Sequence, residues 1–151
     1  MASQPLIDLA SLDLQQTLAG PEQLLSVLAQ RGTFEMLGGV IHRDAEAGII
    51  VGFKDIKADD WWAPDHIPGR PLFPGALMIE TGAQLCSYDY LMHQGDTGER
   101  FLGFGGLNNT RFRGEVGPGV RMYFIGKQNR ARSTMFTYFM QGIVDGKIVF
   151  E

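Results

Sequence analysis

One segment, residues 66–92, constrains the fold of this chain more than any other. Its first ten residues, HIPGRPLFPG, hold three prolines and two glycines, and this composition predicts a rigid, irregular loop with a fixed path. Residues 76–92, ALMIETGAQLCSYDYLM, then predict one helix with apolar side chains on nearly every face. A helix of this kind is buried on almost all sides, so the rest of the chain must wrap around it.

The remainder of the sequence predicts that wrapping. After a loosely helical first stretch, Gly20-Pro21 breaks the chain, and residues 22–31 predict a short packing helix. Strand-like segments cover residues 39–42, 49–53, 101–104, 110–112, 120–126, 134–144 and 147–150. Asp145-Gly146, between the last two strands, is a strong signal for a two-residue hairpin turn. These elements predict an α+β fold with five or six mostly antiparallel strands around one long buried helix.

Composition narrows the class of protein. The 151 residues are 44% hydrophobic and 20% charged, with a net charge of -4. These values suit a single globular domain over residues 1–151 and argue against a general nucleic-acid binder. No apolar run reaches the roughly 20 residues of a membrane span, and the N-terminus lacks a secretory pattern, so a cytoplasmic protein is expected. A single cysteine, Cys86, excludes an intrachain disulfide and a cysteine metal cluster.

Two polar residues stand where packing alone would not put them. Glu80 interrupts the apolar helix, and a buried carboxyl group needs a partner or a proton. The alternative is that Glu80 lies on a narrow exposed stripe or in a structural ion pair. His66 opens the loop rich in proline and glycine. An ordinary loop histidine is a surface residue, but this loop leads directly into the helix that carries Glu80. Together the two side chains suggest proton transfer.

Two further residues belong to the same junction of loop and helix. Gly75 stands at the helix N-terminus, where the first N–H groups lack internal acceptors and could bind a carbonyl oxygen that gains negative charge. Gln84 lies one turn beyond Glu80 on the same helix face, from where its amide could hold the carboxyl group. A polar residue at a seam between helix and sheet is an equally good interpretation of Gln84. A base, an acid and an oxyanion donor around one junction indicate a candidate site.

The segment DHIPGRPLFPGALMIETGAQL resembles the signature of the bacterial β-hydroxyacyl-(acyl carrier protein) dehydratases of the FabZ/FabA type. That signature runs His-Phe-Pro-Gly-x-Pro, then Pro-Gly, then Glu-x-x-Ala-Gln. The positions that match it in register are His66, Pro68, Gly69, Pro71, Pro74, Gly75, Glu80, Ala83 and Gln84. The segment 106–124, GLNNTRFRGEVGPGVRMYF, is similar to a second motif of the family. The resemblance extends from about Leu28 to the end, so residues 1–20 are expected to be an N-terminal extension.

This resemblance implies a hotdog fold, in which the sheet wraps the central helix. It implies a two-fold dimer, commonly assembled as a trimer of dimers, with each active site formed by His66 of one chain and Glu80 of the other. The implied reaction is dehydration of 3-hydroxyacyl-(acyl carrier protein) thioesters to trans-2-enoyl thioesters, without a metal or an organic cofactor. His66 would remove the α-proton, protonated Glu80 would donate to the departing hydroxyl, and the Gly75 N–H would stabilise charge on the thioester carbonyl.

The resemblance also implies an acyl tunnel between helix and sheet, and a docking surface for the acidic acyl carrier protein. The candidate tunnel residues, for each of which ordinary core is the favoured alternative, are Phe73, Leu77, Met78, Phe104 and Leu107. Residues 1–99 hold five Lys and Arg against 14 Asp and Glu, whereas residues 100–151 hold eight against three. This basic C-terminal part supplies the candidate docking residues Arg111, Arg113, Arg130 and Arg132.

Departures from the family pattern suggest a divergent member. Ile67 replaces the usual aromatic residue after the histidine, and Asp65 replaces the usual glycine before it. The stretch 29–40, AQRGTFEMLGGV, keeps little of the pattern that usually precedes the first strand. Two alternatives stay open. One is a hotdog thioesterase, a class that lacks the paired histidine and glutamate motifs, and the other is a non-catalytic protein that binds acyl thioesters.

Overall fold

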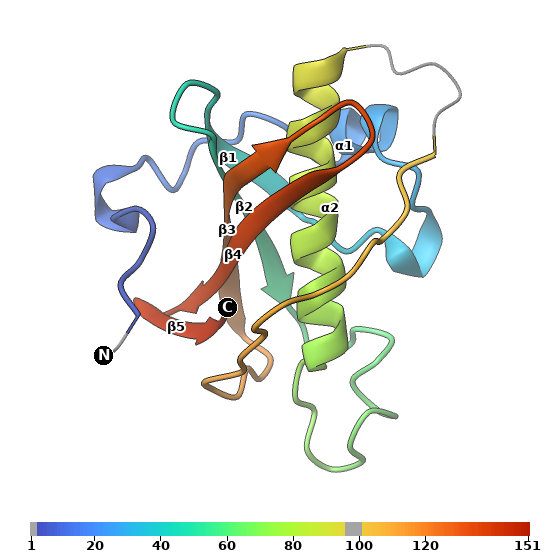
Figure 1. Ribbon diagram of the computed structural model, residues 1–151. Coiled ribbons are helices and arrows are strands. Elements are labelled where there is room, and N and C mark those ends of the chain that lie inside the picture. Colours follow the sequence, from blue (N-terminus) through green and yellow to red (C-terminus); the bar gives the residue numbers. More distant parts are fainter. Residues whose placement is uncertain (1–2, 96–100) are drawn as a thin grey trace.

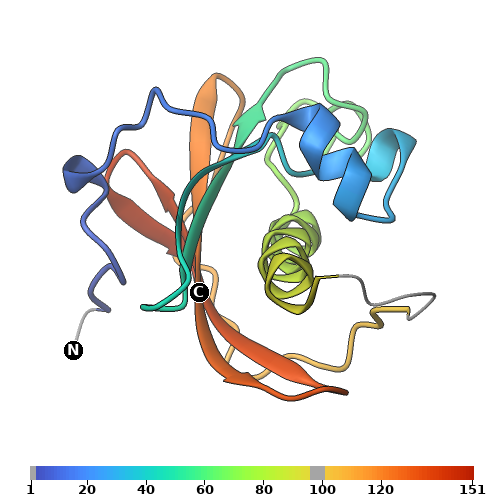
Figure 2. The ribbon, with the colours of Figure 1, turned by 90° about the horizontal axis from the view of Figure 1, so that it is seen from above.

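Helix α2, Gly75–Gln94, is the element around which the chain folds (Figure 1). The computed structural model describes residues 3–95 and 101–151, and in it α2 lies in the hollow of a curved antiparallel sheet (Figure 2). The strands, in the order both of the chain and of the sheet, are β1 (Gly39–Asp44), β2 (Ile49–Ile56), β3 (Val120–Ala131), β4 (Phe136–Val144) and β5 (Lys147–Phe150). The short helical elements are η1 (Leu9–Ser11), α1 (Pro21–Val27) and η2 (Gly32–Phe34). In this part of the chain no helix is both long enough and apolar enough to cross a membrane.

β2 and β3 form the continuous centre of the sheet. They pair without a shift in register from Ile49 opposite Lys127 to Ile56 opposite Val120. Alternate side chains of both strands therefore point to the same face. On the inner face the fully buried residues are Ile50, Ile56, Met122 and Phe124. Together with Leu85 of α2 they belong to the main hydrophobic core.

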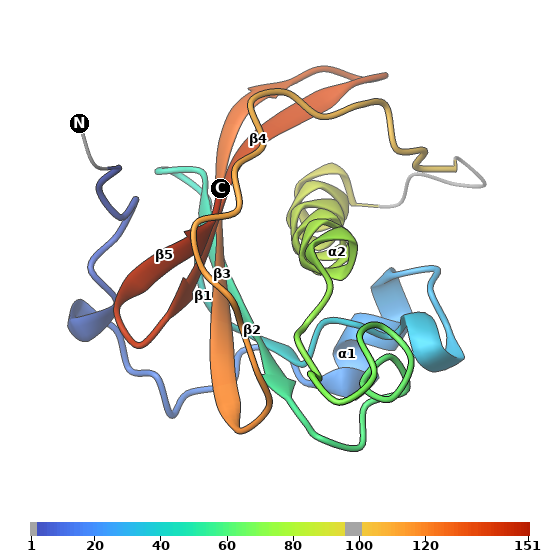
Figure 3. The same cartoon turned by 90° about the horizontal axis from the view of Figure 1, so that it is seen from below.

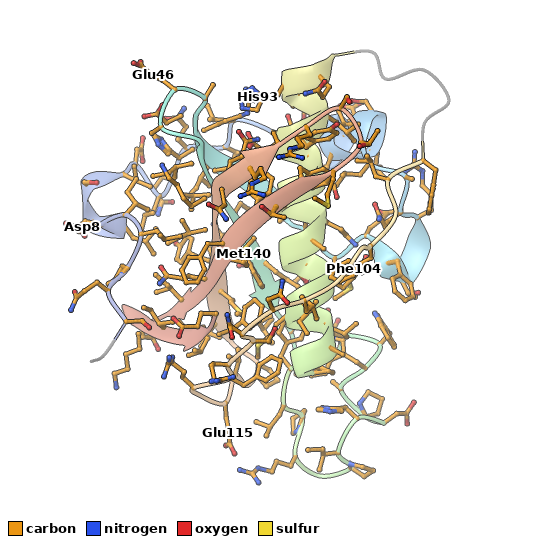
Figure 4. The ribbon with its side chains drawn as sticks, in the orientation of Figure 1. Asp8, Glu46, His93, Phe104, Glu115 and Met140 are labelled. Atoms are coloured by element: carbon orange, nitrogen blue, oxygen red, sulfur yellow. The ribbon has the colours of Figure 1, made fainter. Side chains whose placement is uncertain are left out.

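Small residues let α2 and the sheet approach each other closely. A Cβ atom on Gly82 of α2 would lie 3.1 Å from Cγ of Met140, which Figure 4 shows on β4. A Cβ atom on Gly126 of β3 would lie 3.3 Å from Sγ of Cys86. Burial raises the pKa of the Cys86 thiol, so the thiol stays protonated and packs as a small apolar group.

The predicted central helix and five of the predicted strands are confirmed. The hairpin turn is also confirmed, with Asp145 and Gly146 at φ angles of 49° and 74°. The strand predicted over 101–104 is wrong, and residues 110–112 contribute one isolated bridge, in which Phe112 lies opposite Phe150. A strand needs a hydrogen-bonded neighbour, and no described residue of this chain pairs with 101–104 in that way.

The helix predicted over residues 22–31 is shorter than expected, because α1 ends at Val27. The Arg31 guanidinium explains this end: it donates to the carbonyl oxygens of Leu28 at 2.6 Å and Leu25 at 2.9 Å. These carbonyls would otherwise lack partners at a helix C-terminus. The loosely helical first stretch is reduced to the single turn of η1.

Residues 3–18 form an N-terminal strap across the outer face of the sheet, opposite α2 (Figures 2 and 3). The strap contributes the partly buried side chains of Leu6, Ile7, Leu9, Leu12 and Leu14. They pack on buried residues of the outer face, Ile41, Val51, Phe53, Ile125 and Ile143. The outer face of the sheet is therefore covered by residues of the same chain that precede β1 in the sequence.

A buried amide on β4 fastens the strap. Gln141 is 1% exposed, and its Oε1 accepts from Leu6 N at 2.8 Å while its Nε2 donates to Gln4 O at 3.0 Å. Beyond the strap, Ala19 and Val40 form an antiparallel bridge that ties the chain to the edge strand β1. The strap is thus held by directed bonds as well as by apolar contact.

Glu151, which follows β5, accepts a hydrogen bond from the start of the strap and forms an ion pair with Arg113. Ser3 Oγ donates to Glu151 Oε1 at 3.0 Å, and the Arg113 guanidinium donates to the same oxygen. The hydrogen bond from Arg113 lowers the pKa of Glu151. A lowered folded-state pKa means that this contribution to stability is present above the unfolded-state pKa. It is lost as the pH falls through the folded-state value.

Replacing Gln141 by Leu should loosen the strap. Two hydrogen bonds to a buried side chain are lost, so we expect the free energy of unfolding to fall by about 1–3 kcal/mol. Urea denaturation followed by circular dichroism measures this change. Gln15→Leu, at an exposed strap position, is the control and should change the free energy by less than about 0.5 kcal/mol. Equal values for the two variants would show that Gln141 does not fasten the strap.

Candidate active site

The loop of residues 57–74 carries the chain from the end of β2 to the start of α2 through successive turns. Its end is tied to the segment 101–119, because Phe73 N donates to Val116 O at 2.7 Å. Pro74 is extended, with φ -61° and ψ 133°, and precedes the first helical residue. Proline rings fix φ along this loop, so the loop delivers its side chains to set positions beside the helix N-terminus.

His66 lies on the surface of this loop with its imidazole held in one orientation. Nδ1 is 2.8 Å from the carbonyl oxygen of Leu72. A carbonyl oxygen can only accept, so Nδ1 carries the proton of the neutral ring. The lone pair is then on Nε2, for which the described residues of this chain supply no partner. This nitrogen is free to accept a proton from a bound substrate.

The Gln84 side chain is 2% exposed and uses both ends of its amide. Oε1 accepts from Met36 N at 3.2 Å and from Leu37 N at 3.3 Å. Nε2 donates to Phe34 O at 2.7 Å and to Glu80 Oε1 at 2.8 Å. Because two backbone N–H groups face Oε1, the amide cannot be turned around without losing every bond. Gln84 therefore presents an N–H group to Glu80.

This contact distinguishes the two oxygens of the Glu80 carboxyl group. Oε1 accepts from Gln84 and so cannot carry a proton that points towards Nε2. Within residues 3–95 and 101–151, no hydrogen bond is made by Oε2. Glu80 is partly exposed. If this carboxyl group holds a proton, Oε2 is the oxygen that can give it to a ligand.

Gly75, the first residue of α2, lies under an aromatic ring. A Cβ atom on Gly75 would come within 2.8 Å of Cε1 and Cζ of Phe112. The Phe112 ring is held in turn by Phe150 of β5, with the ring centroids 5.5 Å apart and the planes 21° from parallel. Packing within the chain therefore disfavours a side chain at position 75, in addition to any approach by a ligand.

The structure places the sequence-predicted site residues along the N-terminal half of α2 and in the loop before it, but does not join them all. Gly75 begins the helix, Glu80 and Gln84 follow on it, and His66 lies in the preceding loop. Among the described residues of one chain, His66 and Glu80 share no hydrogen bond or ion pair. Each has a different partner, Leu72 or Gln84.

The candidate tunnel residues divide into core and surface. Phe73 and Met78 are each 3% exposed and pack in the main core, and Leu77 is partly buried against it. Phe104 and Leu107 are 59% and 52% exposed. Figure 4 shows Phe104 beside α2, on the segment that crosses the helix. Only the less buried members of this set are open to a ligand in one chain.

The four candidate docking arginines fall into two groups: Arg111 with Arg113, and Arg130 with Arg132. The first group flanks Phe112, which packs on Gly75 at the N-terminal end of α2. In the second group, Arg132 O accepts from the Tyr90 hydroxyl at 3.2 Å, near the other end of the helix. The helical rise puts Gly75 and Tyr90 about 22 Å apart. On one chain, the two groups form separate surfaces.

Sequence reasoning missed several groups that hold the site. The backbone atoms of Phe34, Met36 and Leu37 bind Gln84, and the Leu72 carbonyl orients His66. Backbone groups carry no residue-specific signal, so a sequence alone does not show them. A cluster of three His, Cys, Asp or Glu side chains able to hold a metal ion does not occur in the described ranges.

Replacing Gly75 by Ala should destabilise the fold although alanine favours helices. The added Cβ must displace the Phe112 ring, at an expected cost of about 1–3 kcal/mol in the free energy of unfolding. Gly117→Ala, where a Cβ atom would meet nothing within 4 Å, is the matched control. The second substitution Phe112→Leu should recover part of the loss, measured by chemical denaturation as a double-mutant cycle. If the effects of Gly75→Ala and Phe112→Leu on the free energy of unfolding are strictly additive, contact with the Phe112 ring is not the reason for glycine at position 75.

Known proteins resemble this chain over most of its length. The FabA-like domain family matches residues 28–151. Two curated relatives are each called 3-hydroxyacyl-[acyl-carrier-protein] dehydratase FabZ. The one from Rhizobium rhizogenes is 31% identical over 129 residues, covering 85% of this chain and 81% of its own. The one from Campylobacter jejuni is 26% identical over 132 residues, covering 85% and 90%.

Two solved structures share the fold. A chain of the dehydratase heterocomplex ApeI:P from Xenorhabdus doucetiae has a TM-score of 0.65 at 14% identity, covering 84% of both chains. The TT0310 protein from Thermus thermophilus has a TM-score of 0.55 at 17% identity, covering 80% of this chain and 92% of its own. The expected hotdog fold is thereby confirmed. With the family matched over residues 28–151, this chain belongs to the FabA-like family of FabZ-type hotdog proteins.

Proposed function

We propose that this chain dehydrates 3-hydroxyacyl-(acyl carrier protein) thioesters to trans-2-enoyl thioesters in fatty-acid or related acyl-chain biosynthesis. The observation that carries the proposal is the pair of poised groups around the start of α2. His66 keeps Nε2 free, and Glu80 keeps Oε2 free while Gln84 holds its other oxygen. The names of the relatives from Rhizobium rhizogenes and Campylobacter jejuni support the same reaction.

In this proposal, the first half of the reaction takes place between the Gly75 N–H and His66. The thioester carbonyl accepts a hydrogen bond from the backbone N–H of Gly75, at the positive end of the α2 dipole. This bond favours the negative charge that develops when the weakly acidic α-proton leaves. His66 Nε2 accepts that proton, and Nδ1–H stays on the Leu72 carbonyl and fixes the ring.

In the second half, Glu80 acts as the general acid. The electron pair of the former α C–H bond forms the double bond to the β-carbon, and the β-hydroxyl departs with the proton from Glu80 Oε2. The products are water and the trans-2-enoyl thioester. His66 then holds an extra proton and Glu80 is a carboxylate, which the Gln84 N–H stabilises. Return of the proton to Glu80 through solvent restores the site for the next turnover.

We infer that two chains share each site in a homodimer. His66 and Glu80 lack mutual contact within one chain, and large apolar side chains on the segment that crosses α2 lack cover. The exposed ones on residues 101–107 are Phe101, Phe104 and Leu107. The segment 101–104 also has no strand neighbour among the described residues. A second copy placed against this segment would cover the apolar side chains and supply its backbone with partners. Assembly of such dimers into a trimer of dimers is compatible with this arrangement.

The partner that delivers the acyl group is proposed to be an acidic acyl carrier protein. Its thioester must reach Gly75, so the nearer basic group, Arg111 and Arg113, is favoured as the docking surface of the same chain. Arg113 is engaged by Glu151, which leaves Arg111 the more available cation of the two. Arg130 and Arg132 would serve a site at the other end of α2, such as one completed by a partner chain.

The acid–base assignment predicts that two substitutions abolish turnover. His66→Ala and Glu80→Gln should each lower kcat/KM by about 100-fold or more, because each removes a proton-transfer group. Enoyl absorbance, followed with 3-hydroxyacyl carrier-protein thioesters of several chain lengths, gives the rate. Glu46→Gln and His93→Ala are controls, since Figure 4 shows both residues away from the start of α2. If the wild-type protein turns over no chain length, the dehydratase assignment is wrong and a non-catalytic acyl-thioester binder becomes the better description.

Shared sites predict that two inactive variants rescue each other. In a mixed dimer of His66→Ala and Glu80→Gln chains, one of the two sites combines the intact histidine of one chain with the intact glutamate of the other. Random mixing after unfolding and refolding should therefore restore roughly a quarter of wild-type activity. Each variant refolded alone is the control. Mixtures that stay as inactive as the separate variants would place both groups of a site on one chain.

A further inference from the structure

Trp61 connects the loop that carries His66 with the segment that holds Gln84. Its indole Nε1 donates to the carbonyl oxygen of Thr33 at 3.1 Å. Its ring lies against Phe34, with centroids 6.4 Å apart and planes 33° from parallel. Trp61 belongs to the loop of residues 57–74, and Thr33 belongs to η2, so this one side chain joins two loops.

The segment that Trp61 reaches is tied to the end of α1 by the Arg31 guanidinium, and few side chains from other elements hold the residues after it. Residues 31–35 are all exposed, and burial begins at Met36. In the part of the chain that the structure describes, the side chains from other elements that bond to the backbone of residues 33–37 are Gln84 and Trp61. The carbonyl of Phe34, which follows Thr33 directly, accepts from Gln84. The bond from Trp61 is therefore made one residue before the carbonyl that Gln84 binds.

We propose that Trp61 is a positioning residue for Glu80, acting through Thr33, Phe34 and Gln84. The bond from Trp61 fixes the η2 carbonyls, these fix the Gln84 amide, and the amide fixes Glu80 Oε1. The proposal rests on the proposed function for its effect on turnover, whereas the structural link itself does not. Trp61 and His66 belong to the same loop. The bond from Trp61 to Thr33 therefore also fixes the position of the loop of residues 57–74 relative to η2.

The adjacent Trp62 offers a matched control within the chain. It is 3% exposed and packs on Phe73, with ring centroids 5.3 Å apart. Its Nε1 is buried and finds no hydrogen-bond partner in the described ranges. Trp62→Phe therefore removes an indole N–H that makes no bond, and Trp61→Phe removes one that does. Both changes keep an aromatic ring.

The experiment compares Trp61→Phe and Trp62→Phe in the full chain. For Trp61→Phe we expect kcat about threefold to tenfold lower with KM within roughly twofold of wild type, the effect of one neutral hydrogen bond. NMR should show the Gln84 side-chain amide protons exchanging with solvent faster by a similar factor. Trp62→Phe should lower the melting temperature through its smaller core side chain and leave kcat and the Gln84 exchange rate unchanged.

The exchange measurement keeps the two proposals separate. If the wild-type protein does not turn over any substrate, the dehydratase proposal fails, yet faster exchange in Trp61→Phe alone still supports the link to Gln84. Exchange and kcat in Trp61→Phe equal to wild type would overturn the positioning role. Equal acceleration of exchange in both variants would also overturn it, because the effect would then follow general loss of stability.

Discussion

The buried amide of Gln84 is the interaction on which the arrangement of the site depends. An amide removed from water must replace each lost hydrogen bond, or the fold pays a large desolvation cost. Gln84 meets this demand with three backbone groups of residues 34–37 and one oxygen of Glu80. Gln84 of the helix therefore positions residues 34–37, which lead into β1. The same backbone groups orient the Gln84 amide, which in turn positions the Glu80 carboxyl group. A polar side chain at the middle of an apolar helix thus links the folding of the sheet edge to the chemistry of the site.

The sequence predicted the parts of the structure that local patterns determine. The apolar run 76–92 and the signal at Asp145-Gly146 are determined within a few residues, and both elements formed as expected. The strand expected over 101–104 did not form, because a strand needs a paired neighbour and residues 3–95 and 101–151 of one chain supply none. The partners of Gln84 likewise could not be predicted from the sequence, since backbone groups distant in sequence come together only through the fold.

Gly75 shows how a single residue can satisfy two requirements that a sequence cannot separate. Its place at the helix N-terminus suggested an opening for a carbonyl oxygen. The structure adds the ring of Phe112, which a side chain at this position would strike. Through Phe112 and Phe150, the start of α2 is in contact with β5, the last strand of the sheet. The backbone at the start of α2 is thereby supported from the far edge of the sheet.

The N-terminal strap changes what the outer face of the sheet can tolerate during evolution. The family match begins at residue 28, but the apolar outer face is compatible with water only because residues 3–18 lie over it. Loss of the strap would have to be accompanied by polar replacements at positions such as Val51 and Ile125, and by a new partner for Gln141. Conversely, the outer face is free to stay apolar as long as the strap persists. The two segments are therefore expected to covary, and an outer face rich in apolar residues becomes a sign, readable in other sequences of this family, that such a strap is present.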